Sequence, residues 1–154
     1  MTRIRAALLC IGSIKTAWLR EGIAEYEKRL QGSLEIIEIP ASKEKEADRQ
    51  KSDESVRLLS ALGKREGLVW VLDVTGKHLA SATFAHDLGA IADRGDSITF
   101  VLGGAYGLTD EVRQRADRIM RLSDMTLPHE LCRLVFLEQL YRAGQIRRGT
   151  GYHH

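Results

Sequence analysis

The 154-residue sequence is poor in cysteine, proline and aromatic residues, with two Cys, two Pro and 6% Phe, Trp and Tyr. Cys10 and Cys132 stand far apart inside apolar stretches, without the spacing of metal ligands. This pattern argues against a disulfide scaffold and a metal site. We therefore expect buried free thiols in a reducing compartment, and a cytoplasmic protein.

Long hydrophobic runs are also missing, since none approaches the ~18 residues that cross a bilayer. Arg3 and Arg5 precede a short apolar run that ends by Gly12, and this run suits a first strand better than an export signal. Hydrophobic residues make up 44% of the chain and charged residues 29%, as in ordinary globular proteins. The length predicts one domain over residues 1–154, with no membrane partner.

The sequence lacks the usual phosphate-binding motifs. The apolar run Ser97–Leu102 leads into Gly103-Gly104-Ala105-Tyr106-Gly107, but no Walker sequence follows and the Gly-x-Gly-x-x-Gly fingerprint is absent. A strand, a glycine turn and a helix start at Thr109-Asp110-Glu111 nevertheless have the geometry of a ligand site in a parallel sheet. The alternative is a tight turn that needs glycine only for its backbone angles.

Strands alternate with helices along the chain. Buried apolar runs predict strands over residues 4–11, 34–39, 68–73, 97–102 and 118–122. Helical spacing of apolar residues predicts helices from residue 16 to Gly32, over 56–62, over 82–92 and from Pro128 to about Ile146. This alternation predicts an α/β protein with a parallel sheet of about five strands.

Two polar segments allow more than one interpretation. Residues 42–54 are dominated by charged residues and Ser, so they form either a solvated loop or the outer turns of a helix. We favour a mobile loop, because charge without apolar periodicity cannot dock, and a contact with RNA stays open. Asp73 ends the third strand before a predicted turn over 74–77, where it could meet a ligand or bond to its own turn.

The last predicted helix is apolar on most of its circumference. Its apolar residues are Leu131, Leu134, Val135, Phe136, Leu137, Leu140 and Tyr141. A helix of this kind must be covered on two sides, and in a small domain a second subunit can supply one of them. The sequence therefore favours a homodimer.

Charge is unevenly distributed, although the net charge is only +2. No acidic residue follows Glu138, whereas five basic residues do: Arg142, Arg147, Arg148, His153 and His154. A basic terminal segment is an electrostatic footprint for the phosphates of a nucleic acid. It could equally be a solvated helix end whose cations suit the helix dipole.

Three blocks, taken together, resemble a known family: Gly103-Gly104-x-x-Gly107-Leu108, Leu122-Ser123-x-Met125-Thr126-Leu127-Pro128-His129 and Glu138-Gln139-Leu140-Tyr141-Arg142-Ala143. With the terminal Tyr152-His153, they resemble the ribosomal RNA large subunit methyltransferase H family nearly end to end. The family often has Pro-Glu where this chain has Ala105-Tyr106. The resemblance implies a SPOUT-class fold with a C-terminal trefoil knot and a homodimer. It also implies methylation of N3 of a pseudouridine in large-subunit (23S) ribosomal RNA, in the assembled ribosome, with S-adenosylmethionine as donor.

The resemblance also implies roles for individual residues. By matched position, the cofactor site would comprise Leu72, Gly103, Leu122, Ser123, Asp124, Met125, Thr126 and Leu127. The N3 proton must leave, and His129, Tyr152 and His153 are the candidates to handle it. Arg142 would recognise a phosphate or a base. Simpler roles stay open: His129 could cap its helix, Tyr152-His153 could dock the tail, and Arg142 could balance Glu138.

Two other functions remain as alternatives. The chain could be a knotted methyltransferase that acts on another RNA, or a module that binds ribosomal RNA without chemistry. A degraded cofactor site would favour the module, but the glycine segment and the run 122–127 are intact.

Overall fold

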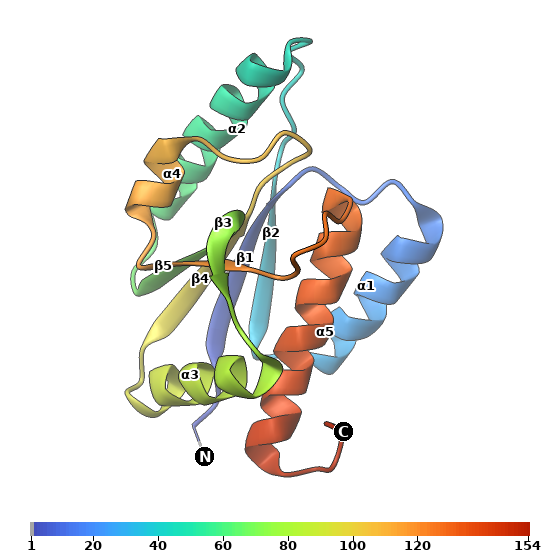
Figure 1. The fold of residues 1–154 in the computed structure, drawn as a ribbon, viewed down its shortest axis with the longest axis vertical. Helices are drawn as coiled ribbons and strands as arrows, with labels where there is room; N and C mark the ends of the chain where they lie inside the picture. Colours follow the sequence, from blue (N-terminus) through green and yellow to red (C-terminus); the bar gives the residue numbers. More distant parts are fainter. Residues whose placement is uncertain (1) are drawn as a thin grey trace.

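The computed structural model describes residues 2–154 and has three layers, with a central sheet between two groups of helices (Figure 1). The strands are β1 (Arg5–Ile11), β2 (Leu34–Ile39), β3 (Leu68–His78), β4 (Ser97–Leu102) and β5 (Arg118–Arg121). The helices are α1 (Ala17–Arg29), α2 (Ala47–Leu62), α3 (Ser81–Asp93), α4 (Asp110–Arg115) and α5 (His129–Arg148). All strand pairs are parallel, in the order β2-β1-β4-β3-β5. The predicted α/β class and five-stranded parallel sheet are confirmed.

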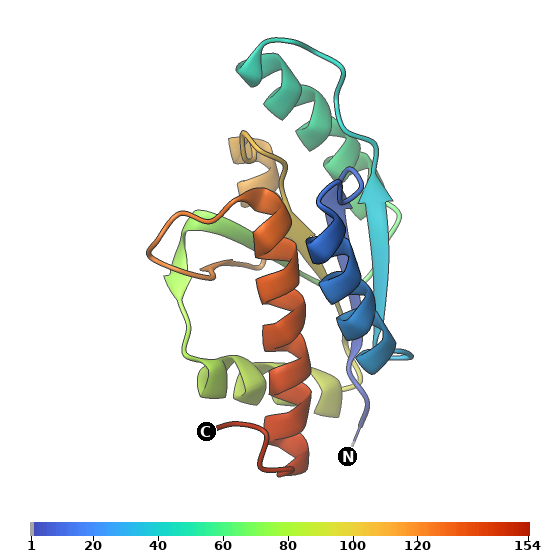
Figure 2. The ribbon, with the colours of Figure 1, turned by 90° about the vertical axis from the view of Figure 1, so that its right-hand side faces the viewer.

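Alternate residues of the central strands enter two separate cores, as the two-residue period of a strand requires. Leu8 and Phe100 face a core shared with α1, α3 and α5, and the neighbouring Leu9 and Val101 face a core shared with α2 and α4. Figure 2 shows α1, α3 and α5 on one side of the sheet and α2 with α4 near its upper end. Both faces are covered, which explains why these strands read as continuous apolar runs.

Helix α5 is covered within its own chain on more of its surface than the sequence suggests. Phe136 is fully buried, and its ring centroid lies 4.7 Å from that of Phe100 in the sheet. Leu137 and Leu140 are buried in the same core. Of the seven apolar residues predicted for this helix, Leu131, Leu134, Val135 and Tyr141 are only partly buried and remain available to a second subunit.

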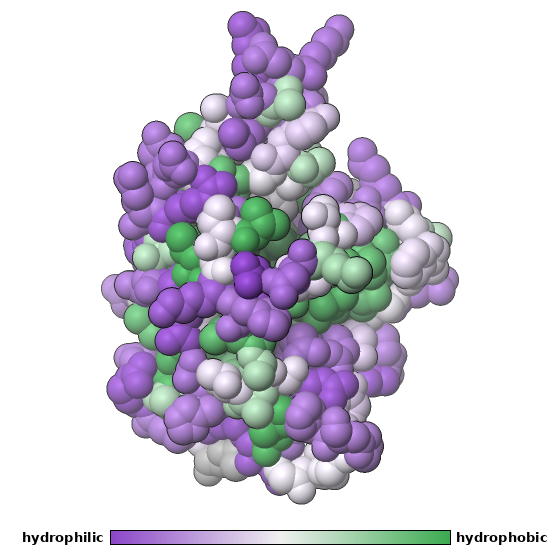
Figure 3. Space-filling model, in the orientation of Figure 1, coloured by the Kyte–Doolittle hydropathy of each residue, from purple (hydrophilic) through white to green (hydrophobic). Residues whose placement is uncertain are grey.

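The expected mobile loop over 42–54 is wrong for its second half, because α2 begins at Ala47. The middle of α2 docks through polar groups: Glu54 and Ser55 are 6% and 1% exposed. A Glu54 carboxylate oxygen accepts a hydrogen bond from the Ser42 amide at 3.0 Å. The outer turns of α2 form the hydrophilic tip at the top of Figure 3.

The predicted turn over 74–77 is also wrong, because β3 continues to His78. A register shift after Leu72 lets Lys77 and His78 pair with the edge strand β5. A Cβ at Gly76 would lie 2.6 Å from backbone atoms of Ile119 and Met120, so this glycine permits a close approach of two strands instead of a turn.

Both thiols are free. Cys10 is buried, as expected, and burial raises its pKa to about 11. Cys132 is only partly buried. No helix within residues 2–154 is both long and apolar enough to cross a membrane.

Candidate functional site

A cavity of about 300 Å³ lies where the pairing of β3 with β4 ends, at Leu72 and Leu102, and is closed by the segment between β5 and α5. The residues predicted for the cofactor converge here from three separate segments. Those that line the cavity are Leu72, Gly103, Leu122, Ser123, Met125, Thr126 and Leu127. Asp124 is not among the lining residues, and its carboxylate instead pairs with Arg121 at 2.9 Å. His129, from the first turn of α5, completes the wall.

The glycine segment after β4 is shaped by three glycines with different tasks. Gly107 has a φ of +80°, which L side chains rarely adopt. A Cβ at Gly103 would lie 2.9 Å from the Leu108 side chain, and one at Gly104 would lie 2.6 Å from a Glu54 carboxylate oxygen. Only Gly107 is therefore required for its backbone angle, and the other two permit close packing around the cavity.

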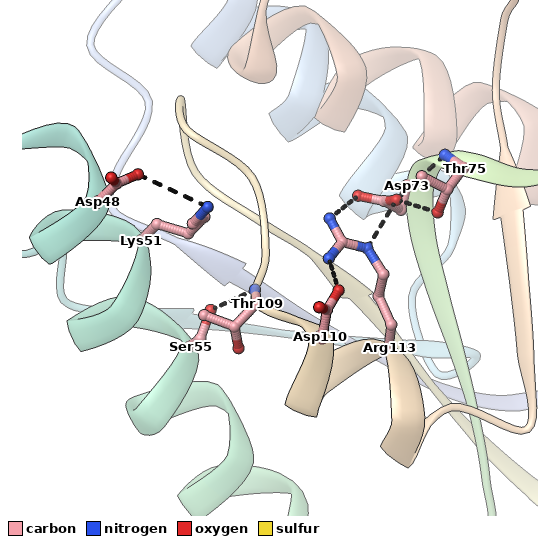
Figure 4. Close-up of polar contacts among 8 residues, drawn as sticks. All are labelled: Asp48, Lys51, Ser55, Asp73, Thr75, Thr109, Asp110 and Arg113. Atoms are coloured by element: carbon pink, nitrogen blue, oxygen red, sulfur yellow. Dashed lines mark hydrogen bonds and ion pairs between the residues drawn. The ribbon is translucent and has the colours of Figure 1, made fainter.

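Polar contacts fix the surroundings of this segment (Figure 4). The Ser55 hydroxyl, from α2, accepts a hydrogen bond from the Thr109 amide at 3.1 Å. The Arg113 guanidinium, from α4, donates to the Asp73 carboxylate at 3.1 and 3.4 Å and to Asp110 at 2.8 Å. Thr109 makes no side-chain capping bond, so the start of α4 depends on these contacts.

Asp73 lines the cavity, and its side chain is 7% exposed. Burial raises the pKa of this carboxyl, but hydrogen bonds from Arg113 and Thr75 outweigh burial and leave the pKa below its usual value. The bond to Thr75 is the local contact that the sequence allowed, whereas the Arg113 pair is an additional contact with α4. Asp73 is therefore a charged residue that connects the buried part of β3 to α4.

Arg121 is the one cavity-lining side chain in residues 2–154 with a buried nitrogen that lacks a hydrogen-bond partner, its Nε. A buried donor without an acceptor is costly, typically by about 1–3 kcal/mol. An anionic or carbonyl group of a bound ligand would satisfy it.

His129 stands at the cavity without a capping hydrogen bond, because the residue at the N-cap of α5 is Pro128. The next residue, Glu130, ties the start of α5 to the β1–α1 loop by accepting bonds from the Lys15 and Thr16 amides, both at 3.1 Å. The proposed capping role for His129 is thus absent from the structure.

The other three residues predicted for catalysis gather at a different place. Arg142 bonds to Glu138 at 3.0 and 2.7 Å, and its guanidinium carbon lies 4.8 Å from the Tyr152 ring centroid. His153 Nδ1 lies 3.1 Å from the Arg142 Nη1. The Tyr152 hydroxyl lies 3.2 Å from a Glu138 oxygen, and burial, with Tyr26 and Glu138 nearby, raises its pKa to about 12.

These residues form a tail cluster (Glu138, Arg142, Tyr152 and His153). The cluster is separated from the cavity by distance along α5. Arg142 follows His129 by thirteen positions on α5, which places them about 20 Å apart along the axis. The structure brings the residues predicted for the cofactor, except Asp124, together with His129, but in one chain it does not bring Arg142, Tyr152 or His153 to them.

Sequence reasoning did not assign four residues of the cavity wall: Val74, Leu102, Arg121 and Cys132. Cys132 follows His129 by three positions on α5, so helical spacing could have placed both on one face. Arg121 carries no such signal, because a basic residue at the end of a short strand is ordinary surface composition.

Comparisons with known proteins agree with this architecture. Residues 4–153 match the family described as "Predicted SPOUT methyltransferase". The chain is 41% identical over 159 residues to Ribosomal RNA large subunit methyltransferase H of Streptococcus equi subsp. zooepidemicus, which covers 97% of this chain and 99% of the relative. The protein of that name from Lactobacillus delbrueckii subsp. bulgaricus is 39% identical over 155 residues, covering 95% and 97%.

Two crystal structures share the fold. A methylase family protein from Neisseria gonorrhoeae has a TM-score of 0.52 at 15% identity, covering 90% of this chain and 82% of that chain. The SpoU methyltransferase AviRb from Streptomyces viridochromogenes has a TM-score of 0.50 at 13% identity, covering 96% and 62%. With a family match over almost the entire chain and relatives aligned nearly end to end, the parallel sheet and its glycine-lined cavity belong to a member of the SPOUT methyltransferase family.

Proposed function

We propose that this chain methylates N3 of a pseudouridine in large-subunit ribosomal RNA, with S-adenosylmethionine as the methyl donor. The observation that carries the proposal is the convergence of Leu72, Gly103 and the run 122–127, except Asp124, on one cavity. The names of the aligned relatives support ribosomal RNA as the substrate. The choice of pseudouridine N3 rests on the family resemblance of the sequence.

The cavity suits the proposed donor. Apolar side chains from Leu72, Leu122 and Leu127 can enclose an adenine and a methionyl chain, while backbone groups of the glycine segment bond to polar edges. The unsatisfied Nε of Arg121 is a donor for the carboxylate of the methionyl end. When bound, S-adenosylmethionine supplies an electrophilic methyl group, and holding it in line with the nucleophile accounts for much of the catalysis.

The N3 proton needs an acceptor near the donor. His129 is the titratable imidazole of the cavity wall, and neutral imidazole can accept a proton near neutral pH. Tyr152 is a poor base, because its raised pKa keeps the phenol protonated near neutral pH. We therefore assign proton handling to His129 or His153, and give Tyr152 a role in stacking or in docking the tail.

A homodimer would bring together the predicted catalytic residues that are far apart along α5 in one chain. Trp18 is 63% exposed and lines a small apolar hollow with Pro128, His129 and Leu131, next to the cavity. Figure 3 shows hydrophobic residues gathered over this part of α5. A second copy packed here with its α5 reversed would bring its Arg142, Tyr152 and His153 toward this cavity. The C-terminal knot and a cytoplasmic location are further parts of the proposal.

The test is methyl transfer from labelled S-adenosylmethionine to large-subunit ribosomal RNA that carries pseudouridine but lacks the N3-methyl group, offered free and within assembled ribosomes. We expect label in N3-methylpseudouridine after nucleoside digestion, and only with ribosomes. Label in another nucleoside would instead indicate a knotted methyltransferase with a different target. Tight RNA binding without label in either substrate would indicate the binding module.

A further inference from the structure

A second, larger groove lies at the opposite end of the molecule from the cofactor cavity, where both chain ends emerge (Figures 1 and 2). It has a volume of about 570 Å³ and runs between the residues before β1, the end of α1 and the last turns of α5. Four arginines line it, Arg3, Arg29, Arg147 and Arg148, and none of its lining residues is acidic.

Two of these arginines carry charge that the fold does not balance. Arg29 pairs with Glu25 at 3.1 Å, and Arg147 pairs with Asp93 at 3.0 Å. Arg3 and Arg148 are exposed, and within residues 2–154 neither forms an ion pair with a carboxylate. The groove therefore holds two guanidinium groups without a carboxylate partner, although Arg3 also donates a hydrogen bond to the Gln31 carbonyl at 3.4 Å. This excess of positive charge favours an anionic occupant.

The shape of the groove also leaves room for a ligand. Gly144 lies inside α5, where glycine destabilises a helix by roughly 0.5–1 kcal/mol relative to alanine. A Cβ at this position would meet only the tip of Arg148, at 3.9 Å. Packing therefore does not require this glycine, and its missing side chain leaves one wall of the groove open.

An aromatic surface joins the groove to the tail cluster. The Tyr141 ring lines the groove, and the guanidinium of Arg29 lies 5.4 Å from its centroid. The Tyr152 ring packs edge-on against Tyr141 with centroids 5.2 Å apart. Guanidinium groups beside partly exposed aromatic rings are a combination that binds a nucleic-acid backbone and its unpaired bases.

We propose that this groove binds the phosphodiester backbone of the RNA substrate, at nucleotides other than the one that is methylated. This inference rests on the proposed function and adds a second contact region to it. Arg3 and Arg148 bind phosphates, and the Tyr141 edge guides the strand toward the tail cluster. A protein partner fits less well, because the free groups of the groove are cations and not apolar side chains.

The test compares wild type with the Arg3→Ala/Arg148→Ala double variant, using ribosomes that carry the pseudouridine but lack its methyl group as the probe, over a range of KCl concentrations. We expect weaker binding and a log K versus log[salt] slope smaller by roughly 1.4, at about 0.7 per lost single-strand phosphate contact. Arg115→Ala removes an exposed arginine of α4, outside the groove, and should leave the slope unchanged. Gly144→Leu should weaken RNA binding by filling the groove while all charges are kept.

Calorimetry with S-adenosylmethionine separates the two proposals. If wild type binds the cofactor and methylates RNA, but the double variant keeps the wild-type slope, the groove inference is overturned and the proposed function stands. If wild type neither binds nor methylates ribosomal RNA, both fail. If the double variant changes from dimer to monomer in sedimentation with an unaltered RNA slope, the groove is a subunit contact and the inference is wrong.

Discussion

Gly103 has no side chain at the point where the glycine segment folds back on Leu108. A Gly103→Val side chain would collide with Leu108 and with the Gly107 carbonyl, 2.9 and 3.1 Å from the Cβ position, and would push the segment into the cavity. We expect affinity for S-adenosylmethionine to fall at least tenfold, about 1.4 kcal/mol, by calorimetry. Gly63→Val is the matched control, because its nearest contacts are ordinary at 3.5 and 3.6 Å. Undiminished affinity in folded Gly103→Val would remove this loop from the cofactor site.

Asp73, a residue of the cavity wall, makes the unfolding free energy depend on pH in the acid range. Its folded pKa lies below the unfolded value of about 3.9, so its contribution is present above about pH 4 and is lost as pH falls through the folded pKa. Asp73→Asn should lower the unfolding free energy by about 1–3 kcal/mol at pH 7, with a smaller difference in acid. Urea unfolding at pH 7 and at about pH 3 measures this. Asp110→Asn, whose side chain is 85% exposed, should change little at either pH.

At the scale of the element, apolar pattern predicted the buried strands well and the polar contacts poorly. Strands 34–39 and 97–102 have the predicted bounds, because their apolar residues enter the two cores. The middle of α2 docks through Glu54 and Ser55, which look like surface residues in a sequence. Gly76 predicted a turn, although it serves a close strand contact that only the tertiary structure reveals.

The part of the candidate site that we propose for the cofactor could be anticipated from the sequence. The strand alternation placed Asp73 and the glycine segment at one edge of the sheet, and the family resemblance added the run 122–127. The tail residues were grouped with His129 by resemblance alone, although helical rise already separates them along α5. Arg121 could not be predicted, since its importance lies in one buried nitrogen.

The tail after α5 should serve the substrate more than the fold. Gly149 and Gly151, both with positive φ, turn the chain back so that Tyr152 packs on Tyr141. Deleting residues 150–154 removes this contact, the Tyr152 bond to Glu138, the Thr150 bonds to Gln145 and the Arg142–His153 contact. These are partly exposed contacts worth roughly 1–3 kcal/mol together, so Tm should fall by less than about 10 °C. Cofactor affinity should persist while RNA methylation falls steeply.

Point variants can separate the proposed roles of Tyr152 and His153 in the tail. Tyr152→Phe keeps the ring and should retain most activity, whereas His153→Ala should lose activity if this imidazole handles the proton. A truncated protein that methylates RNA at the wild-type rate would mean that the tail is only a solvated end.

At the scale of the whole molecule, the proposed dimer can be tested at Trp18. Phe136 is unsuitable for this purpose, because it is fully buried in the core. Trp18→Glu should leave the circular dichroism spectrum unchanged and shift sedimentation at micromolar concentration from dimer to monomer. Val56→Glu, at a site 65% exposed on α2, should remain a dimer. A monomeric wild type would contradict the proposal.

β5 and α5 come late in the chain, so the cavity is completed only after the other segments that line it have been synthesised. The wall from Leu122 to His129 is synthesised after every other segment that lines the cavity, and α5 covers the sheet last. A nascent chain that has not yet released these residues from the ribosome cannot hold the methyl donor. Because a ligand stabilises only the state that binds it, cellular S-adenosylmethionine would favour finished chains over partial ones. The same geometry would keep the protein inactive while a ribosome is still synthesising it.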